Sequence, residues 1–212
     1  MLNLLKRMPS DQPGPVLTGD RVLLRPARME DWSSWAEVRR VSRTFLEPWE
    51  PTWASDSLTQ QAFRRRVRIL QRERLAGTSS GLLMFDREGG QVIGGLTIAD
   101  IRRGVAMTCS IGYWVGEPYA RQGYMSEGVA VVLEHIFDTL RLHRVEAACL
   151  PDNEASQRLL RRLGFHEEGL ARGYLKIDGR WQDHRLFALL ESDWRHFRLQ
   201  QHQHRAAALA GD

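Results

Sequence analysis

The chain has 212 residues, of which 42% are hydrophobic and seven are tryptophan, enough for one domain with a substantial core. No apolar stretch approaches the roughly 18–20 residues of a membrane-spanning helix, and the start of the chain lacks the small-residue cleavage site of a signal peptide. The net charge of +4 leaves a phosphate-rich partner such as a ribosome open. The arginines, however, concentrate in one predicted helix over 58–75, where such a run is usually a solvated face.

The chain divides into an irregular leader over 1–17, one domain over 18–194 and a polar, His-rich tail over 195–212. We interpret the HQH cluster at His202–His204 as part of a mobile end rather than a metal site, and we expect no metal. Cys109 and Cys149 fall on predicted strands. They are therefore expected to be reduced core thiols, which favours a cytoplasmic location.

The first elements are a strand over Arg21–Arg25 and a helix over 30–40, with tryptophans and a valine at helical spacing. The segment Phe45–Trp53, FLEPWEPTW, cannot be a regular helix because Pro48 and Pro51 interrupt it. Aromatic residues in such a loop suggest a binding surface. The structural alternative is that the tryptophans pack the helices together.

The rest of the chain alternates strand-like and helical stretches. After the helix over 58–75, the pattern predicts strands over 81–86, 91–101 and 108–115, a helix over 126–140 capped by Ser126, a strand over 145–150, a helix over 153–163, and strands over 167–171 and 181–190 around a turn at 177–180. This order predicts one mixed α/β sheet. The strands 108–115 and 145–150, joined through a helix, should be parallel neighbours.

A glycine turn centred on Arg121, Gln122, Gly123 and Tyr124 follows the strand 108–115 and opens the next helix. Unpaired backbone N–H groups at such a helix start can bind a phosphate or pyrophosphate. The spacings of the dinucleotide fingerprint and of the P-loop are both absent. An ordinary strand–turn–helix connection has a similar sequence.

The element order and this turn resemble the GNAT superfamily of acyl-CoA-dependent N-acyltransferases. The family turn usually reads Arg/Gln-x-x-Gly-x-Gly/Ala, and the stretch Ala120–Met125 keeps only its central Gly123. PDNEASQRLLRRLGF, residues 151–165, is similar to the Asn-x-x-Ser/Ala helix of the family, which ends in Gly-Phe. FLEPWEP (45–51), YMSEG (124–128) and YLKIDGRWQDH (174–184) resemble the ribosomal-protein-alanine N-acetyltransferases of the RimJ/RimL type. The resemblance covers residues 18–194.

The resemblance implies a GNAT-type mixed, mostly antiparallel twisted sheet with a splayed parallel strand pair and flanking helices. The pantetheine arm of acetyl-CoA would enter between the ends of strands 108–115 and 145–150, where the N–H near Val115 polarises the thioester carbonyl. The residues expected to bind acetyl-CoA are Tyr113, Trp114, Val115, Arg121, Gln122, Gly123, Tyr124, Met125, Ser126, Asn153 and Ser156.

Many relatives place a proton-donating tyrosine seven residues after the asparagine, where this chain has Leu160. Ser156 is the natural substitute, as a proton donor or as a ligand of CoA, unless it is only a small core-facing residue. Asn153 is expected at the reacting region, although helix capping would also explain it. Glu117 is a candidate general base, against the alternative of a solvated loop acid.

The implied function is transfer of the acetyl group from acetyl-CoA to a protein N-terminal α-amine, such as the N-terminal alanine of a ribosomal protein. Glu47, Trp49 and Glu50 are expected to border the acceptor site, where carboxylates would attract a cationic N-terminus. The alternatives are a relative that acetylates a small amine, such as an antibiotic or polyamine, and a degenerate module that binds acyl-CoA without turnover. No membrane or direct nucleic-acid partner is required, and a monomer and a homodimer are equally compatible with the sequence.

Overall fold

The computed structural model describes residues 14–209, with side chains through residue 200. Its centre is an eight-stranded sheet in the order β1-β2-β3-β4-β5-β6-β8-β7. The strands are β1 (Leu17–Thr18), β2 (Val22–Arg25), β3 (Ser80–Asp86), β4 (Val92–Arg102), β5 (Thr108–Val115), β6 (Arg144–Cys149), β7 (His166–Ile177) and β8 (Arg180–Leu190). Only the β5–β6 pair is parallel among these described strands. The expected mixed, mostly antiparallel sheet with one parallel pair is confirmed.

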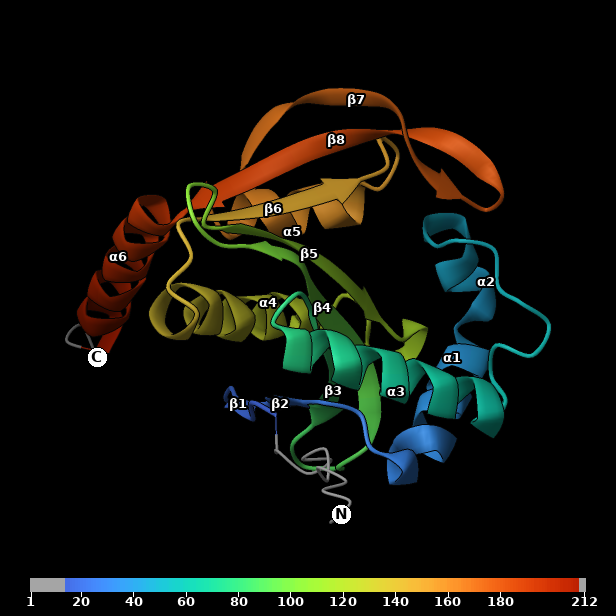
Figure 1. Cartoon of the computed structure of the whole chain (residues 1–212). Helices are drawn as coiled ribbons and strands as arrows, with labels where there is room; N and C mark the ends of the chain where they lie inside the picture. Colours follow the sequence, from blue (N-terminus) through green and yellow to red (C-terminus); the bar gives the residue numbers. More distant parts are fainter. Residues whose placement is uncertain (1–13, 210–212) are drawn as a thin grey trace, which may run out of the picture.

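Helices cover both faces of this sheet (Figure 1). They are η1 (Met29–Asp31), α1 (Trp32–Val41), α2 (Arg43–Leu46), η2 (Glu47–Trp49), α3 (Gln60–Ala76), η3 (Glu117–Tyr119), α4 (Tyr124–Glu134), the π-helical turn η4 (His135–Thr139), α5 (Glu154–Arg162) and α6 (Glu191–Leu209). No helix among the described residues is long and apolar enough to cross a membrane.

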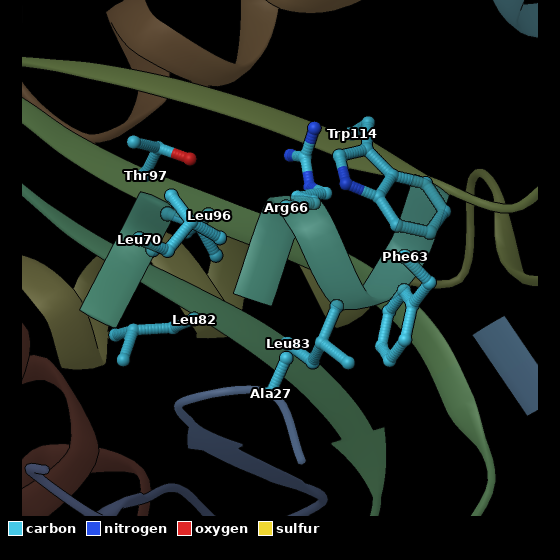
Figure 2. A pocket seen from close by; sticks show the side chains of 10 residues that line it. Ala27, Phe63, Arg66, Leu70, Leu82, Leu83, Leu96, Thr97 and Trp114 are labelled. Atoms are coloured by element: carbon cyan, nitrogen blue, oxygen red, sulfur yellow. The ribbon is translucent and has the colours of Figure 1, made fainter. Parts of the chain in front are cut away.

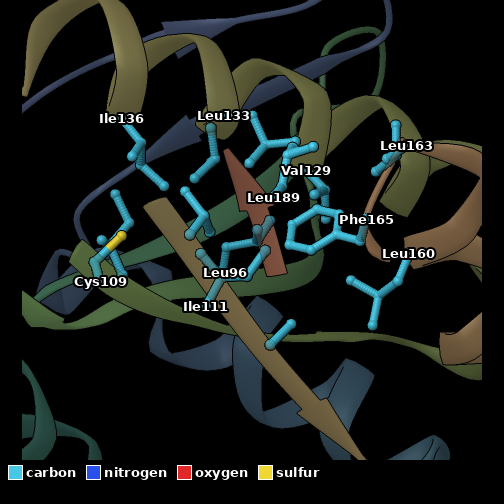
Figure 3. Packing of buried hydrophobic residues seen from close by; sticks show 14 of the residues in the cluster. Leu96, Cys109, Ile111, Val129, Leu133, Ile136, Leu160, Leu163, Phe165 and Leu189 are labelled. Carbon is cyan, nitrogen blue, oxygen red and sulfur yellow. The ribbon is translucent and has the colours of Figure 1, made fainter. Parts of the chain in front are cut away.

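Alternate side chains of β3 enter two separate cores because successive residues of a strand point to opposite faces. Leu82 and Met84 join the larger core, which contains α4 and the centre of the sheet. Its packing is shown in Figure 3, where Val129 and Leu133 of α4 face side chains of three strands, among them Leu96, Ile111 and Leu189. Leu83 and Phe85 join a smaller core with α1 and α3. Helices α1 and α3 therefore lie on one face of the sheet and α4 on the other.

The hairpin of β7 and β8 arches over β6, and its tip lies near the end of α2 (Figure 1). Its turn residues, Asp178 and Gly179, both have positive φ angles of 42° and 75°. This is the combination that a tight two-residue hairpin requires and that an Asp-Gly pair favours. The turn was predicted at these residues. Strand β7 is longer than the expected 167–171, because its pairing with β8 continues across two register shifts.

Several expected boundaries are wrong. Part of the segment 45–53 is helical: α2 continues into the 3₁₀ turn η2, where Pro48 occupies a first-turn position that tolerates proline. Ser126 does not cap α4, because the helix already begins at Tyr124 with Gly123 in the cap position. The strand β1 and the helix α6 have no counterpart in the expectations. The leader before residue 14 lies outside the described residues, as do the side chains of His202–His204.

Candidate acetyl-transfer site

The parallel strands β5 and β6 pair only over their first residues. Thr108, Cys109 and Ser110 lie opposite residues 144–146, and no pairing joins the strands beyond that point. Strand β6 instead stays fully paired to β8 on its other side. The strands thus splay at the C-terminal end of β5, as the family resemblance implied. The gap between Ile111–Val115 and Ala147–Cys149 leaves backbone groups of both strands without a sheet partner there.

The N–H of Val115 points into this gap. The amide of Gly116 donates to the carbonyl of Ile93 across the β4–β5 ladder (2.9 Å), and Val115 lies opposite Gly94 in the same register. Because inward- and outward-facing amides alternate along an antiparallel strand, the amide of Val115 faces away from β4. It therefore faces the gap, and its role in polarising a thioester carbonyl stays a prediction.

Two hydroxyl groups meet beside the gap. The Tyr113 hydroxyl lies 2.8 Å from the Oγ atom of Ser156, which α5 carries across from the neighbouring strand. Burial of the hydroxyl raises the pKa of Tyr113, and the hydrogen bond to Ser156 opposes this rise only in part. The tyrosine therefore stays protonated at neutral pH. Burial also raises the pKa of Cys149 at the end of β6, and its hydrogen bond with Ser156 opposes this rise.

Asn153 fixes the position of Ser156. The Asn153 side-chain oxygen accepts a hydrogen bond from the Ser156 amide (3.0 Å), which is the N-cap interaction of α5. Leu160, one turn further along, is fully buried in the core and offers no proton. The capping role of Asn153 is confirmed, and its role in binding pantetheine stays a prediction. Sequence reasoning placed Tyr113 on the strand end but missed its hydroxyl as the partner of Ser156.

The glycine turn has the backbone of an anion site. Arg121 and Gly123 both have positive φ angles, 61° and 86°, and the first helical bond of α4 runs from the Glu127 amide to the Gly123 carbonyl. The amides of Tyr124, Met125 and Ser126 therefore have no acceptor within the helix, and the helix dipole favours a negative charge in front of them. The Met125 side chain itself is buried in the core, so only its backbone is available to a ligand.

Arg21 connects the start of the domain to this turn. Its guanidinium donates to the Gln122 carbonyl (3.1 Å), forms an ion pair with Glu127 (3.1 Å) and lies 4.8 Å from the centre of the Tyr124 ring. A cation is thus half exposed next to the free amides. The side chain of Gln122 closes the preceding loop by donating to the Pro118 carbonyl (2.7 Å). The contribution of Arg21 was missed because about a hundred residues separate it from the turn.

The opposite face of β5 carries the aromatic side of the site. Trp114 faces α1 and α3, and the Arg39 guanidinium lies 4.8 Å from its ring and 4.1 Å from that of Trp53. A hollow lies between α3 and the sheet next to Trp114 (Figure 2). It is lined by Ala27, Phe63, Arg66, Leu70, Gly81, Leu82, Leu83, Leu96, Thr97 and Trp114. Phe63 and Trp114 give this hollow aromatic walls.

The acids expected to recruit a cationic N-terminus already have partners. Glu50 accepts from both guanidinium ends of Arg39 (3.0 and 2.5 Å) and from the Trp53 indole (2.8 Å), while its carbonyl accepts from the Asp178 amide (3.0 Å). Glu47 pairs with Arg43 at the surface. Glu50 therefore holds α1, the loop and the hairpin tip together. The exposed residue of the expected trio is Trp49, and a role of the three in acceptor binding stays a prediction.

Glu117 begins the 3₁₀ turn directly after β5 and is exposed. Its backbone amide donates a hydrogen bond to the Oγ atom of the fully buried Ser42 (2.8 Å). This bond anchors the strand end to α1. The carboxylate is available to solvent, and its role as a general base stays a prediction. Among the described residues, no group of three His, Cys, Asp or Glu side chains gathers as a metal site would require.

These features agree with the comparisons to known proteins. Residues 21–166 match the acetyltransferase (GNAT) domain family. The chain therefore belongs to the GNAT acetyltransferases, and it is an acetyl-CoA-dependent N-acetyltransferase.

Its relatives include members of the branch that the sequence motifs indicated. The "[Ribosomal protein uS5]-alanine N-acetyltransferase" of Escherichia coli is 32% identical over 87% of this chain and 95% of its own length. The "Probable N-acetyltransferase YjcK" of Bacillus subtilis is also 32% identical, over 84% of this chain and 98% of its own. The structure of Mycobacterium smegmatis RimJ in complex with CoA-disulfide has a TM-score of 0.76 at 34% identity, covering 84% of this chain and 86% of that one.

Proposed function

We propose that this enzyme transfers the acetyl group of acetyl-CoA to the N-terminal α-amine of a ribosomal protein, and that an N-terminal alanine is its acceptor. The Tyr113–Ser156 hydroxyl pair at the strand splay carries the catalytic part of this proposal. The acceptor part is supported by relatives named as acetyltransferases of ribosomal proteins. A ribosomal acceptor would place the enzyme in the cytoplasm.

Three groups of the chain divide the reaction between them. The Val115 amide would stabilise the negative charge that develops on the carbonyl oxygen when the amine attacks. As the C–S bond breaks, Ser156 would give its proton to the departing thiolate, and Tyr113 would replace that proton through their shared hydrogen bond. The attacking neutral amine would lose one proton through water to Glu117, and solvent would return a proton to Tyr113. The sum is an amide and a free thiol, and a further proton is released only when the amine starts as an ammonium ion.

An α-amine suits a site without a buried base. Its reference pKa is about 7.7–8.0, against about 10.4 for lysine, so roughly a tenth or more of an α-amine is neutral at pH 7, against less than about a thousandth of a lysine. This favours an N-terminus over a lysine side chain. The hydroxyl pair also argues against a degenerate module, although Ala120 and Leu160 depart from the family pattern.

Release of free thiol from acetyl-CoA tests the proposal in four parallel reactions. The acceptors are a peptide with an N-terminal alanine, the same peptide starting with serine, the alanine peptide with a blocked N-terminus and an internal lysine, and a polyamine. We expect turnover with the first and little with the others. Turnover only with the polyamine would indicate the small-amine alternative. Acetyl-CoA binding without any turnover would indicate the degenerate module.

A further inference from the structure

Helix α3 carries a row of arginines that the acetyl-transfer site does not use. Its inner face is apolar: Phe63 is fully buried and Val67 packs against the smaller core. Arg64, Arg68 and Arg72 follow at intervals of four residues on the outer side and are exposed. Residues four apart in a helix lie one above the other. The three arginines, which we call the α3 row, therefore form a line about 12 Å long at 1.5 Å per residue.

The charge of this helix is exceptional within the chain. Its 17 residues contain six arginines and one acid, Glu73, a formal charge of +5, whereas the whole chain carries +4. All the positive excess of the protein therefore resides here. Elsewhere the arginines are mostly neutralised in pairs, as Arg25 is by Asp31 and Arg144 by Glu168.

The α3 row lacks such neutralisation. Within the part of the chain that the structure describes, no ion pair or hydrogen bond involves the side chains of Arg64, Arg68 or Arg72. The neighbouring Arg65 differs, because it pairs with Asp56 (2.5 Å). Three guanidinium groups in line, without acids between them, create a positive field that falls off over a Debye length of about 8–10 Å.

We infer that the α3 row is a docking surface for the phosphate backbone of double-helical RNA. Guanidinium groups bind phosphate with paired hydrogen bonds and stay charged at every physiological pH. A line of equally spaced cations matches a line of phosphates, and such contacts carry affinity without reading sequence. This inference deepens the proposed function, on which its biological meaning rests, since ribosomal-protein acceptors are found next to RNA.

Other anionic partners fit this surface less well. A helix that binds a membrane surface inserts a continuous free apolar face, but Phe63 and Val67 of α3 are packed in the smaller core. The exposed large apolar residues of this helix are only Ile69 and Leu75. Single-stranded RNA needs aromatic side chains for base stacking, and the outer side of α3 has none. Helix α3 lies on the same face of the sheet as Trp114, since Phe63, Val67 and Trp114 belong to the same smaller core. RNA held there would bring its bound protein to the acceptor face.

The test measures binding of the full chain to a fluorescein-labelled 20-base-pair RNA duplex by anisotropy at several salt concentrations. The variant Arg64→Gln with Arg68→Gln and Arg72→Gln removes the row. The control variant Arg141→Gln with Arg162→Gln and Arg172→Gln removes three exposed charges from other elements. Arg65→Gln removes a charge of α3 that is already paired. Circular dichroism and acetylation of a short alanine peptide show that each variant is folded and active.

We expect the row variant to bind the duplex at least tenfold more weakly at low salt, while both controls stay within threefold of the unchanged protein. The slope of log affinity against log salt should fall by about three, roughly one for each lost phosphate contact. Replacing the row with three lysines should retain most of the binding. Peptide acetylation should be equal in all variants, because none of these residues lies at the splay.

Equal RNA binding by the row variant and the unchanged protein would overturn the inference. So would an absence of binding to the duplex at low salt, or equal losses in the row and control variants. Stronger binding to vesicles containing phosphatidylserine than to RNA would indicate a membrane partner instead and would also overturn it. RNA binding that depends on the row in a protein unable to acetylate alanine peptides would refute the proposed acceptor and leave the docking surface intact.

Discussion

The Tyr113 hydroxyl and the Ser156 Oγ atom lie 2.8 Å apart although 43 residues separate them in the chain. They meet because α5, the helix that follows β6, lies next to the end of β5 at the place where β5 and β6 separate. Ser156 is also tied to Asn153 through its own amide. A serine whose backbone is held by a cap and whose hydroxyl is held by a buried phenol has a defined position next to the gap.

The first prediction concerns this pair as a proton donor. Ser156→Ala and Tyr113→Phe should each lower kcat with an alanine peptide by about 100-fold, while the dissociation constant of acetyl-CoA stays within threefold. The double variant should be little worse than the poorer single one, because the two groups act in one relay. Steady-state kinetics and calorimetry measure the two quantities. Losses that multiply in the double variant would show that the hydroxyls act separately.

The second prediction concerns the glycine turn. Gly123 has a φ of 86°, and a Cβ atom there would lie 3.1 Å from the Arg21 guanidinium. Gly123→Asp should weaken CoA binding at least tenfold, about 1.4 kcal/mol, because it places a negative charge before the free amides. Gly123→Asn has nearly the same shape, tolerates this backbone conformation and should retain most of the affinity. Equal CoA affinity in folded Gly123→Asp and the unchanged protein would exclude the turn as the pyrophosphate site.

The third prediction separates the two acids of the loop. Glu50→Gln leaves the Arg39 guanidinium, whose side chain is only 13% exposed, without its counter-charge and should destabilise the fold by about 1–3 kcal/mol. Glu47→Gln breaks a surface pair and should cost less than about 0.5 kcal/mol. Urea denaturation gives both values. The Michaelis constant for the peptide should rise in Glu50→Gln because the loop loosens, and unchanged values would show that the ion pair does not shape the acceptor side.

The fourth prediction concerns the cap of α5. Asn153→Ala should lower the free energy of unfolding by about 1 kcal/mol and lower kcat as well, because Ser156 loses its backbone anchor. Asn153→Asp keeps an acceptor oxygen in the same place and should preserve stability. If the aspartate variant is as stable as the natural protein yet binds acetyl-CoA more weakly, the amide itself contacts pantetheine. If it matches the natural protein in both, capping accounts for the residue.

The fifth prediction uses the buried thiol of Cys109. Burial raises its pKa to about 12 from an ordinary value of about 9, so the folded state holds this proton more tightly than the unfolded chain. The stabilisation is complete below pH 9 and is lost as the pH rises from 9 towards 12, where the folded thiol also ionises. Between pH 8 and pH 11, the midpoint temperature of thermal unfolding should therefore fall more steeply for the natural protein than for Cys109→Ala. Parallel curves would contradict the raised pKa.

Local patterns of sequence were sufficient for most elements. The helices over 60–76 and 154–162 and the strands β3 to β6 have the periodicity and turn residues that predict them, and the Asp178–Gly179 turn follows from residue type alone. Element ends were less certain where a glycine in the left-handed region, such as Gly123, replaced the expected capping serine. The helix α6 was missed because its polar composition lacks a clear apolar stripe.

The candidate site was predictable where it depends on backbone conformation and not where it depends on distant partners. Gly123 and Asn153 are visible in short motifs. The links of Arg21 to Gln122, Arg39 to Glu50 and Ser42 to Glu117 join residues whose pairing only the tertiary fold decides. Glu50 illustrates the difference. Its charge suggested attraction of a cationic substrate, whereas in the fold its carboxylate holds Arg39 and Trp53 together.

The strand order has a consequence for how the enzyme matures during its own synthesis. Strand β6 forms three residues of parallel pairing with β5, while its long antiparallel ladder requires Arg185–Leu190 of β8, which are translated much later. Until those residues leave the ribosome, the edge of β6 that pairs with β8 has unpaired backbone hydrogen-bonding groups. Strand β6 is then not held in place beside the gap to β5. Long-range pairings of this kind form slowly, and exposed strand edges are prone to aggregate. The nascent chain should therefore gain activity in a single late step, after β8 inserts between β6 and β7.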